Sequence, residues 1–573
     1  MEWQMGKIQV DMFEVQLGAA LFLQFQLESG QVVRVLADAG VDKTSGYPIN
    51  HVFNKLFDAT GKPTSVWSDF SRENPKLDLI VGTHYDADHL RGLVPIIGKL
   101  DLEIDEIWLP PIQDDDGVVS AGSVSGGNAS LLKRLMAEDG EAVLARYLSK
   151  RLERIEDVDR VYKIGLLEDQ QEHYSQMMAL VIEGNKVLRN RSEPLEGELL
   201  ANPEQVTRYF ELQRSNAVRV LDQLDDGHAH ELQEEQDQRF VDTVEQLKKY
   251  YRNKWFLKSL QRGLTWYDIV AFDRLSHAWR NDVILRSDCL ALETIRKSAA
   301  NEAINATNLA EVVNAIKRRH AAGGSRIRVV SEAIPQGAPR YFHWNGAKFQ
   351  ETNPDFRGEL GFHLMGPSHE LVTQLHEKLP IGTYMLAYRA EDLMSGTVTP
   401  SNRLSYVMRF HLQEQAILVT GDAGFTDFAP TRSKNYYPKL LALLKPLHVV
   451  QIAHHGGMNH HFYEALKAGG LPSQNEWSFL MLSHATNDTT RPRAEFTRFV
   501  ALFRNDKRND VSVLFTSKPT HDKVDTILDL IHPVVPGSPI RAESGDVRLS
   551  FPLSADPARA GTQWRVQQHC VQV

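Results

Sequence analysis

The sequence contains two cysteines in 573 residues, Cys289 and Cys570. Two are too few for a disulfide framework or a cysteine-rich zinc site, and such low usage favours a reducing compartment. The sequence also lacks a long apolar run, because polar and charged side chains interrupt the richest stretch, residues 440–453. Acidic residues near the N-terminus, with no basic head before an apolar stretch, predict no secretory signal. We therefore expect a soluble cytoplasmic protein with no membrane association.

Excess positive charge is absent as well. The chain has 64 lysines and arginines against 74 aspartates and glutamates, a formal net charge of −10. This balance argues against a general nucleic-acid coat and leaves a local basic groove open. Hydrophobic residues make up 42% and charged residues 24% of the chain, which is typical of globular proteins.

The sequence pattern divides the chain into three parts. Short apolar runs with turn signals fill residues 1–113 and 325–573, whereas residues 114–324 have mostly helical periodicity. We expect an α/β domain interrupted by a large, mostly α-helical insertion. Strands are expected at residues 7–15, 20–27, 32–37, 77–82, 104–109, 327–330, 341–344, 361–365, 404–410, 416–420, 449–453, 479–483 and 511–516.

The densest group of chemically active residues follows the strand expected at 77–82. His84, Asp86, Asp88 and His89 fall within six positions there. Imidazole and carboxylate groups suit Zn²⁺, Mn²⁺ or Fe. His84 and Asp86 alternate and could face one metal, while Asp88 and His89 could continue onto a helix and face a second. The alternative is a polar turn that caps a helix through Asp88.

Two later strands end in the same kinds of residue. Asp422 follows the strand expected at 416–420, and His454 and His455 follow the one expected at 449–453. A carboxylate such as Asp422 could bridge two metals, or could bond its own backbone in a turn. One histidine of the pair is expected to be a ligand and the other to contact ligands or substrate, with two surface histidines as the alternative.

Together the three strand ends predict a dinuclear metal-dependent hydrolase. Two divalent ions about 3.5–4 Å apart activate a shared water, so metal-bound hydroxide would attack phosphorus or carbon. Asp88, His89 and Asp422 are the residues expected to carry this catalysis. The sequence shows no nucleophile elbow, phosphate loop or dinucleotide fingerprint that would indicate another mechanism.

At this point the motifs resemble a known family. The run H-Y-D-A-D-H at 84–89 resembles the H-x-[HD]-x-D-H signature of the metallo-β-lactamase fold, and with residues 90–93 it is similar to the hydrolase domain of ComEC-type competence proteins, which internalise DNA. Further similar motifs follow in order: D-A-G at 38–40, L-M-G-P at 364–367, N-R-L-S-Y-V at 402–407, T-G-D at 420–422, A-H-H-G at 453–456, Ser483 and Arg491-Pro492.

The resemblance implies a metallo-β-lactamase-like αββα sandwich that holds two divalent ions, Zn or Mn. Asp422 would bridge the ions, Asp38 would orient the ligand loop, and His454 would lie beside the ligands. The implied metal ligands are His84, Asp86, Asp88, His89, Asp422 and His455.

This chain departs from the family pattern at two points. The histidine that many hydrolases of this fold supply after the first motif has no obvious equivalent, and the nearest candidates are His363 and His369. Arg491 stands where the competence relatives often have histidine before proline. The membrane channel of those relatives is absent, so transport is not implied.

Three functions remain open. The leading one is a phosphodiesterase or nuclease, in which a basic and aromatic part of the insertion would hold DNA or another phosphodiester; the alternative for these aromatics is packing inside the insertion. The second is hydrolysis of a small ester, lactone or nucleotide, with the insertion over the pocket. The third is an effector or sensor subunit of an anti-phage defence-type assembly, with the insertion docking a protein partner. The basic and aromatic residues are Lys254, Trp255, Lys258, Arg262, Trp266, Tyr267, Arg274, Trp279, Arg280, Arg296, Lys297, Lys317, Arg318 and Arg319.

Overall fold

The structure is a computed structural model of the whole chain, and its described residues form an α/β protein with two mixed sheets. The described residues are 7–41, 46–67, 75–112, 135–136, 143–144, 147–148, 305–306, 308–353, 358–376, 400–429, 435–457, 459–471, 478–485, 488, 491–505, 511–517, 545–551 and 564–569. Most of the predicted insertion, including the basic and aromatic residues at 254–297, lies outside them.

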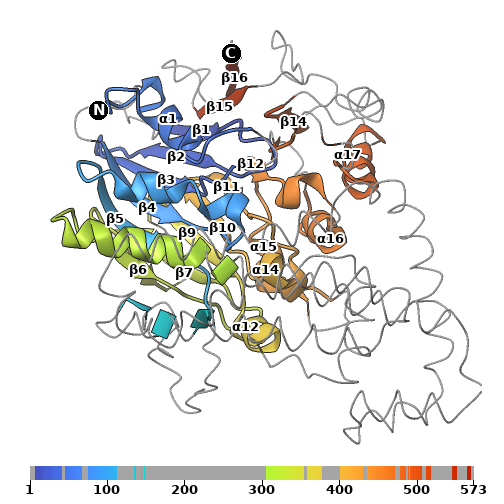
Figure 1. Ribbon diagram of the computed structural model, residues 1–573. Coiled ribbons are helices and arrows are strands. Elements are labelled where there is room, and N and C mark those ends of the chain that lie inside the picture. The colour runs from blue at the N-terminus through green and yellow to red at the C-terminus, as the bar shows by residue number, and fades with distance from the viewer. Residues whose placement is uncertain are drawn as a thin grey trace, which may run out of the picture.

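The first sheet combines the beginning and the end of the chain (Figure 1). Its strand order is β16-β15-β1-β2-β3-β4-β5-β6, antiparallel from β16 to β3 and parallel from β3 to β6. The strands are β1 (Lys7–Met12), β2 (Leu21–Gln26), β3 (Val32–Ala37), β4 (Lys76–Val81), β5 (Glu103–Trp108), β6 (Arg328–Val330), β15 (Asp546–Phe551) and β16 (Arg565–His569).

The second sheet repeats this plan. Its order is β14-β13-β12-β11-β10-β9-β7-β8, with parallel pairs from β11 to β14 and antiparallel pairs in the rest. The strands are β7 (Arg340–Trp344), β8 (Phe349–Thr352), β9 (Leu360–Gly366), β10 (Val407–Leu412), β11 (Gln415–Val419), β12 (Val449–Gln451), β13 (Ser478–Leu482) and β14 (Val511–Phe515).

One hydrophobic core joins the two sheets. Alternate residues of β1, such as Ile8 and Val10, belong to the same buried cluster as Phe362 of β9 and Phe410 of β10. Phe25 of β2 stacks on Phe410 with ring centroids 6.3 Å apart. Because side chains alternate across a strand, each sheet turns one apolar face to the other and needs cover on its outer face.

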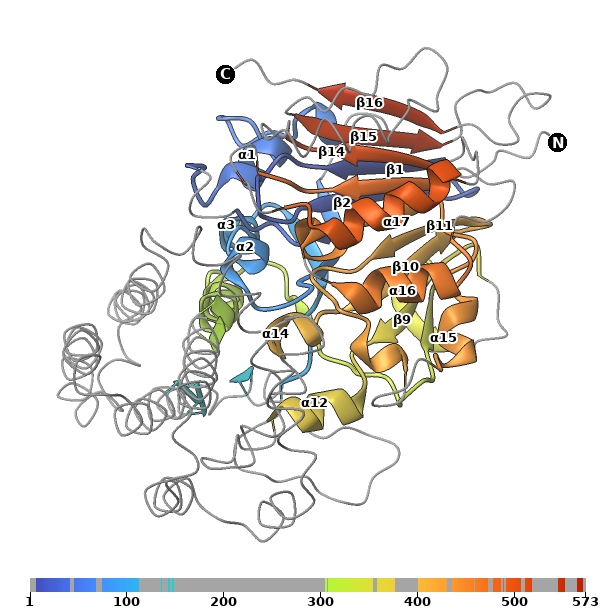
Figure 2. The ribbon, with the colours of Figure 1, turned by 90° about the vertical axis from the view of Figure 1, so that its right-hand side faces the viewer.

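Helices supply that cover on both sides (Figure 2). The outer face of the first sheet packs in a second core with α1, α2, α3 and the helix of residues 308–321, and α15, α16 and α17 lie over the second sheet. The helical elements are α1 (His51–Leu56), η2 (Ser65–Trp67), α2 (Ala87–Leu90), α3 (Leu93–Gly98), α12 (His369–His376), α14 (Pro400–Arg403), η4 (Thr426–Phe428), α15 (Pro438–Ala442), η5 (Ala453–Gly456), α16 (His460–Ala468) and α17 (Ala494–Asn505). Every helix among the described residues is too short or too polar to span a bilayer.

The expected α/β class and all thirteen expected strands agree with the structure, which shifts their ends by a few residues. The sequence pattern missed β8, β15 and β16. The two ends of the predicted insertion contribute to the core under α2 and α3, through residues such as Leu135 and Leu309.

One expectation about the insertion is wrong. The sequence pattern places Arg319 among the basic residues that could hold a phosphate backbone, but the side chain is buried on the helix of residues 308–321. Its guanidinium donates hydrogen bonds to the main-chain oxygens of Ile97, Lys99 and Leu102. The guanidinium is used in hydrogen bonds to these carbonyls, so Arg319 joins the helix to the end of α3.

Candidate metal centre

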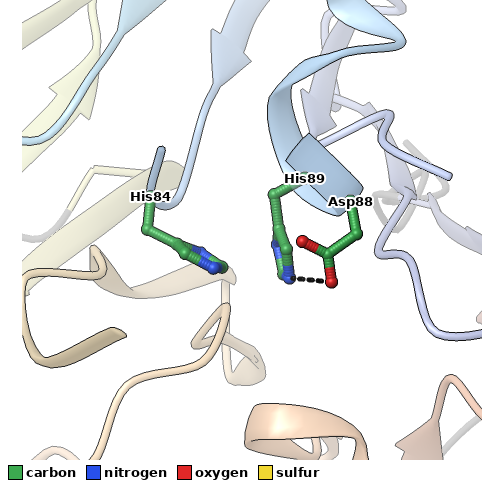
Figure 3. A group of neighbouring side chains, drawn as sticks. All are labelled: His84, Asp88 and His89. Carbon is green, nitrogen blue, oxygen red and sulfur yellow. Dashed lines mark ion pairs between the residues drawn. The ribbon is translucent and has the colours of Figure 1, made fainter. Parts of the chain in front are cut away.

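Three loops that are distant in sequence meet at the carboxyl ends of their strands. β4 leads to His84, β11 leads to Asp422, and β12 leads to His455. Figure 3 shows His84 on the loop after β4 and Asp88 and His89 on α2, with the three side chains extending into a common space. The carboxyl ends of parallel strands commonly gather functional loops in this way.

Close glycine contacts hold α2 against the first sheet. A Cβ on Gly40 would lie 1.9 Å from the carbonyl carbon of Asp88, and one on Gly92 would lie 1.6 Å from the main-chain oxygen of Ala39. The main-chain N–H of Ala39 donates to the oxygen of His89 at 2.9 Å. Only glycine permits this close approach of the two backbones, and the approach fixes the positions of Asp88 and His89 relative to the first sheet.

Asp38 connects the end of β3 to the ligand loop. It adopts φ +59°, a left-handed conformation that aspartate tolerates better than most residues. Its carboxylate accepts hydrogen bonds from the Thr83 main-chain N–H at 2.7 Å, from the Thr83 hydroxyl at 2.6 Å and from His89 Nδ1 at 2.8 Å. Nδ1 of His89 therefore carries a proton, and Nε2 is the ring nitrogen that faces the site and could bind a cation after losing any proton of its own.

The Thr83 hydroxyl orients the other histidine of the loop. Its proton goes to Asp38, so its lone pair accepts from His84 Nδ1 at 3.2 Å. His84 then presents its own Nε2 toward the site. The rings of His84 and His89 lie 3.8 Å apart, centroid to centroid.

Asp422 lies between the histidines with its two oxygens facing different partners. Oδ2 is 3.9 Å from His84 Nε2, whereas Oδ1 is 3.4 Å from His89 Nε2 and 3.8 Å from His455 Nε2. Asp86 Oδ2 lies 3.6 Å from His84 Nε2, and Asp88 Oδ2 lies 3.7 Å from His455 Nε2. None of these pairs forms a hydrogen bond through the histidine Nε2, and a cation between the groups could contact both members of a pair.

Three buried nitrogens carry the strongest sign of a metal. Nε2 of His84, His89 and His455 is shielded from solvent and has no hydrogen-bond partner. Each buried polar atom left without a partner costs about 1–3 kcal/mol. Two groups of ligand atoms, each within 4.8 Å of one another, include them: His84 with Asp88 and His89, and His89 with Asp422 and His455. Imidazole nitrogen and carboxylate oxygen together suit Zn²⁺ or Mn²⁺.

The charges in the site depend on one another. Burial lowers the pKa of His89, but the carboxylates of Asp38, Asp422 and Asp88 outweigh it and hold that pKa well above its usual range. Burial raises the pKa of Asp422, and the neighbouring His89 and His455 outweigh it and hold the pKa well below its usual range. Excess negative charge thus gathers around the imidazoles, and a cation would neutralise it.

The late histidine pair has an unusual backbone. His454 and His455 both adopt φ above +50°, directly before Gly456, and this left-handed run turns only His455 into the ligand groups. His454 is half-buried beside it. Burial and, to a smaller extent, the cation of Arg491 lower the pKa of His454 to about 4 against the opposing charge of Asp422.

The two candidates for the missing histidine lie elsewhere. His363 is on β9 opposite Arg409 and Tyr341, where burial, with Arg409 adding to it, lowers its pKa to about 3. His369 begins α12. Among the described residues, neither belongs to a group of close ligand atoms.

Sequence reasoning overlooked two residues in direct contact with the predicted ligands. Thr83 bonds Asp38 and His84, as described above, and the Asn402 amide donates to Asp422 Oδ2 at 3.3 Å. A hydroxyl residue directly before the His84–His89 run is a pattern from which the contact of Thr83 with the ligand loop could have been predicted. Asn402 lies in the N-R-L-S-Y-V motif at 402–407, and that motif alone does not indicate a contact with Asp422.

Comparison with known proteins identifies no family for this chain. No protein-family model matches it, and no curated protein matches its sequence.

Proposed function

We propose that the chain is a dinuclear metal-dependent hydrolase of the metallo-β-lactamase type that cleaves phosphodiesters, with nuclease activity as its leading form. The observation that carries this proposal is the convergence of three buried, unpartnered imidazole nitrogens on carboxylates from separate loops. A purely structural cluster would pair those nitrogens with hydrogen-bond partners.

The contacts of the Asp86 and Asp422 oxygens divide the ligands into two sets, which differ from the groups of closest atoms in that His84 is separated from Asp88 and His89. His84 and Asp86 with Oδ2 of Asp422 would hold one ion, and Asp88, His89 and His455 with Oδ1 of Asp422 would hold the other. Divalent ions in such a pair polarise a phosphoryl oxygen and lower the pKa of water.

The remaining residues position these ligands. Asp38 fixes the tautomer and ring orientation of His89, and Thr83 does the same for His84. Asn402 holds one oxygen of Asp422 in place. Because these partners are themselves buried and come from β3, β4 and α14, the ligand geometry is set before substrate arrives.

A cation beside the site favours an anionic substrate. Arg491 lies next to the His454–Gly456 turn, because Pro492 packs against Gly456 and the Arg493 N–H donates to the Gly456 oxygen at 2.9 Å. The Arg491 guanidinium is partly exposed, 3.6 Å from Asp488, and its charge acts on His454. A phosphodiester carries a negative oxygen that arginine binds well, whereas a lactone or neutral ester does not.

The architecture also supports the proposal. Two mixed sheets packed face to face, with helices outside and ligands at the carboxyl ends of strands, are what the resemblance to the competence hydrolases implies.

The test is cleavage of single- and double-stranded DNA with Mn²⁺ or Zn²⁺, beside a neutral lactone and a neutral ester. Asp88→Ala and Asp422→Ala are expected to lower DNA cleavage more than about 100-fold, since even outer partners of metal ligands contribute 10–100-fold. Asp101→Ala is the matched control, because that carboxylate is 74% exposed. Equal cleavage by all four proteins would refute a metal-dependent nuclease, and turnover of the neutral substrates alone would refute the phosphodiester class.

A further inference from the structure

Tyr85 stands between two predicted metal ligands. His84 precedes it, and Asp86, which follows it, is the N-cap of α2. The Tyr85 peptide groups are thus the covalent connection between the loop that presents His84 and the helix that presents Asp88 and His89. Tyr85 itself is buried.

Two side-chain hydrogen bonds tie Tyr85 to remote segments. The Asn308 amide Nδ2 donates to the Tyr85 main-chain oxygen at 2.9 Å, and the Tyr85 hydroxyl donates to the main-chain oxygen of Pro110. The neighbouring Leu109 oxygen accepts from the Tyr406 hydroxyl at 2.7 Å. The main-chain N–H of Tyr406 in turn donates to the Thr83 oxygen at 2.7 Å.

Pro110 and Asn308 bracket residues 111–307. Pro110 follows β5, where the chain leaves the first sheet, and Asn308 lies on the helical segment that leads back to β6. Both boundaries therefore contact the same residue, and that residue separates His84 from Asp86.

Asn308 is a poor choice for packing alone. It is buried among apolar neighbours in the helix, and its Oδ1 has no hydrogen-bond partner. An apolar residue would avoid this cost. The hydrogen bond from Nδ2 to the Tyr85 oxygen offsets the cost of burying that amide group.

We propose that Asn308 and Tyr85 are positioning residues through which the two boundaries of residues 111–307 set the geometry of the His84–His89 ligand run. This inference rests on the proposed metal site. A displacement of either boundary would move the Tyr85 peptide and, with it, the separation of His84 from the ligands on α2.

Cobalt binding by the full chain tests the inference, with the d–d absorption spectrum and chelator competition as readouts that do not depend on activity. Asn308→Leu removes the donor, Asn308→Asp keeps the size of the side chain, and Tyr85→Phe removes the hydroxyl alone. Each variant is expected to bind Co²⁺ about 10–100-fold more weakly and to shift the d–d bands. Asn314→Ala, at a half-buried position of the same helix, is the matched control and is expected to match the wild type.

Thermal melting identifies which variants fold, and any one folded variant decides the question. Wild-type affinity and spectrum in a folded Asn308 or Tyr85 variant would overturn the inference alone. A wild-type protein that binds no cobalt would overturn the proposed function and this inference with it.

Discussion

His89 donates its Nδ1 proton to the carboxylate of Asp38 at 2.8 Å, and both side chains are fully buried. This contact leaves Nε2 of His89 as the only ring atom able to bind a cation. It also couples the end of β3 to α2, so His89 is oriented by a residue that follows a strand other than β4, the strand that leads to α2.

Weakening that contact is expected to weaken metal binding without unfolding the protein. Asparagine tolerates the left-handed backbone of position 38, so Asp38→Asn keeps the fold but removes the charge that orients His89. Metal affinity is expected to fall about 10–100-fold, as measured by chelator competition. Asp58→Asn, at a surface turn, serves as control, and unchanged affinity in Asp38→Asn would contradict the orienting role.

Asp422 is expected to control the binding of both ions because each of its oxygens faces a different ligand set. Asp422→Ala should reduce the bound metal at both positions, whereas Asp88→Ala should reduce it mainly at the position next to His455. Elemental analysis of protein purified with Zn²⁺ or Mn²⁺ measures the metal bound per chain. An Asp422→Ala protein that retains as much metal as the wild type would show that the carboxylate does not bridge.

Gly40 is expected to be intolerant of any side chain. A Cβ there would lie 1.9 Å from the Asp88 carbonyl carbon and 2.1 Å from the His89 nitrogen, both backbone atoms that cannot rotate away. Gly40→Ala should lower the free energy of unfolding of the metal-free protein by about 1–3 kcal/mol. Gly98→Ala, where a Cβ meets no atom within 4 Å, is the control in urea denaturation. Similar unfolding of both variants would mean that α2 can move aside.

Asp427 is expected to make stability depend on pH. Burial raises its pKa from 3.8 to about 6, against a hydrogen bond of 2.7 Å from the Ser368 N–H to its Oδ2. Between about pH 4 and 6 the folded protein keeps a proton that the unfolded chain has lost, so the free energy of unfolding falls as pH rises through this window.

Asp427→Asn should remove that part of the dependence. The variant is expected to lose less stability than the wild type between pH 4.5 and 7.5, as measured by thermal melting in matched buffers. Asp101→Asn, at an exposed site, should follow the wild-type curve. Parallel curves for Asp427→Asn and wild type would exclude Asp427 as the titrating group.

Arg319 is expected to affect stability rather than nucleic-acid binding. Arg319→Met removes the guanidinium donor from the main-chain oxygens of Ile97, Lys99, Leu102 and Ser325 and should lower the free energy of unfolding by at least about 2 kcal/mol. The adjacent Arg318→Met, at an exposed position, should change it little. Equal effects in urea denaturation would contradict the structural role of Arg319.

The sequence predicted the strands and the three converging loops well because both depend on local pattern. A short apolar run indicates a strand, and polar residues directly after it mark the edge of a sheet, so the clustering of His84, Asp422 and His455 could be predicted without knowledge of strand pairing. The contact of Asn402 with Asp422 joins α14 to the loop after β11, and no local sequence pattern indicates it.

Long-range contacts explain the remaining errors. Arg319 follows Lys317 and Arg318, and a basic run usually indicates a solvated helix face, yet the side chain reaches the carbonyls at the end of α3. The pairing of β15 with β1 joins residues more than five hundred positions apart, and no periodicity within either segment specifies a partner.

The place of β15 beside β1 has a consequence for synthesis. A ribosome releases β1 first, but the neighbour that occupies one of its edges emerges only after every predicted ligand has left the exit tunnel. Until then, β1 displays a row of unpaired amides and carbonyls, which readily recruit other chains. Nascent chains stalled before β15 should therefore aggregate or bind chaperones, whereas chains that include β15 should aggregate less.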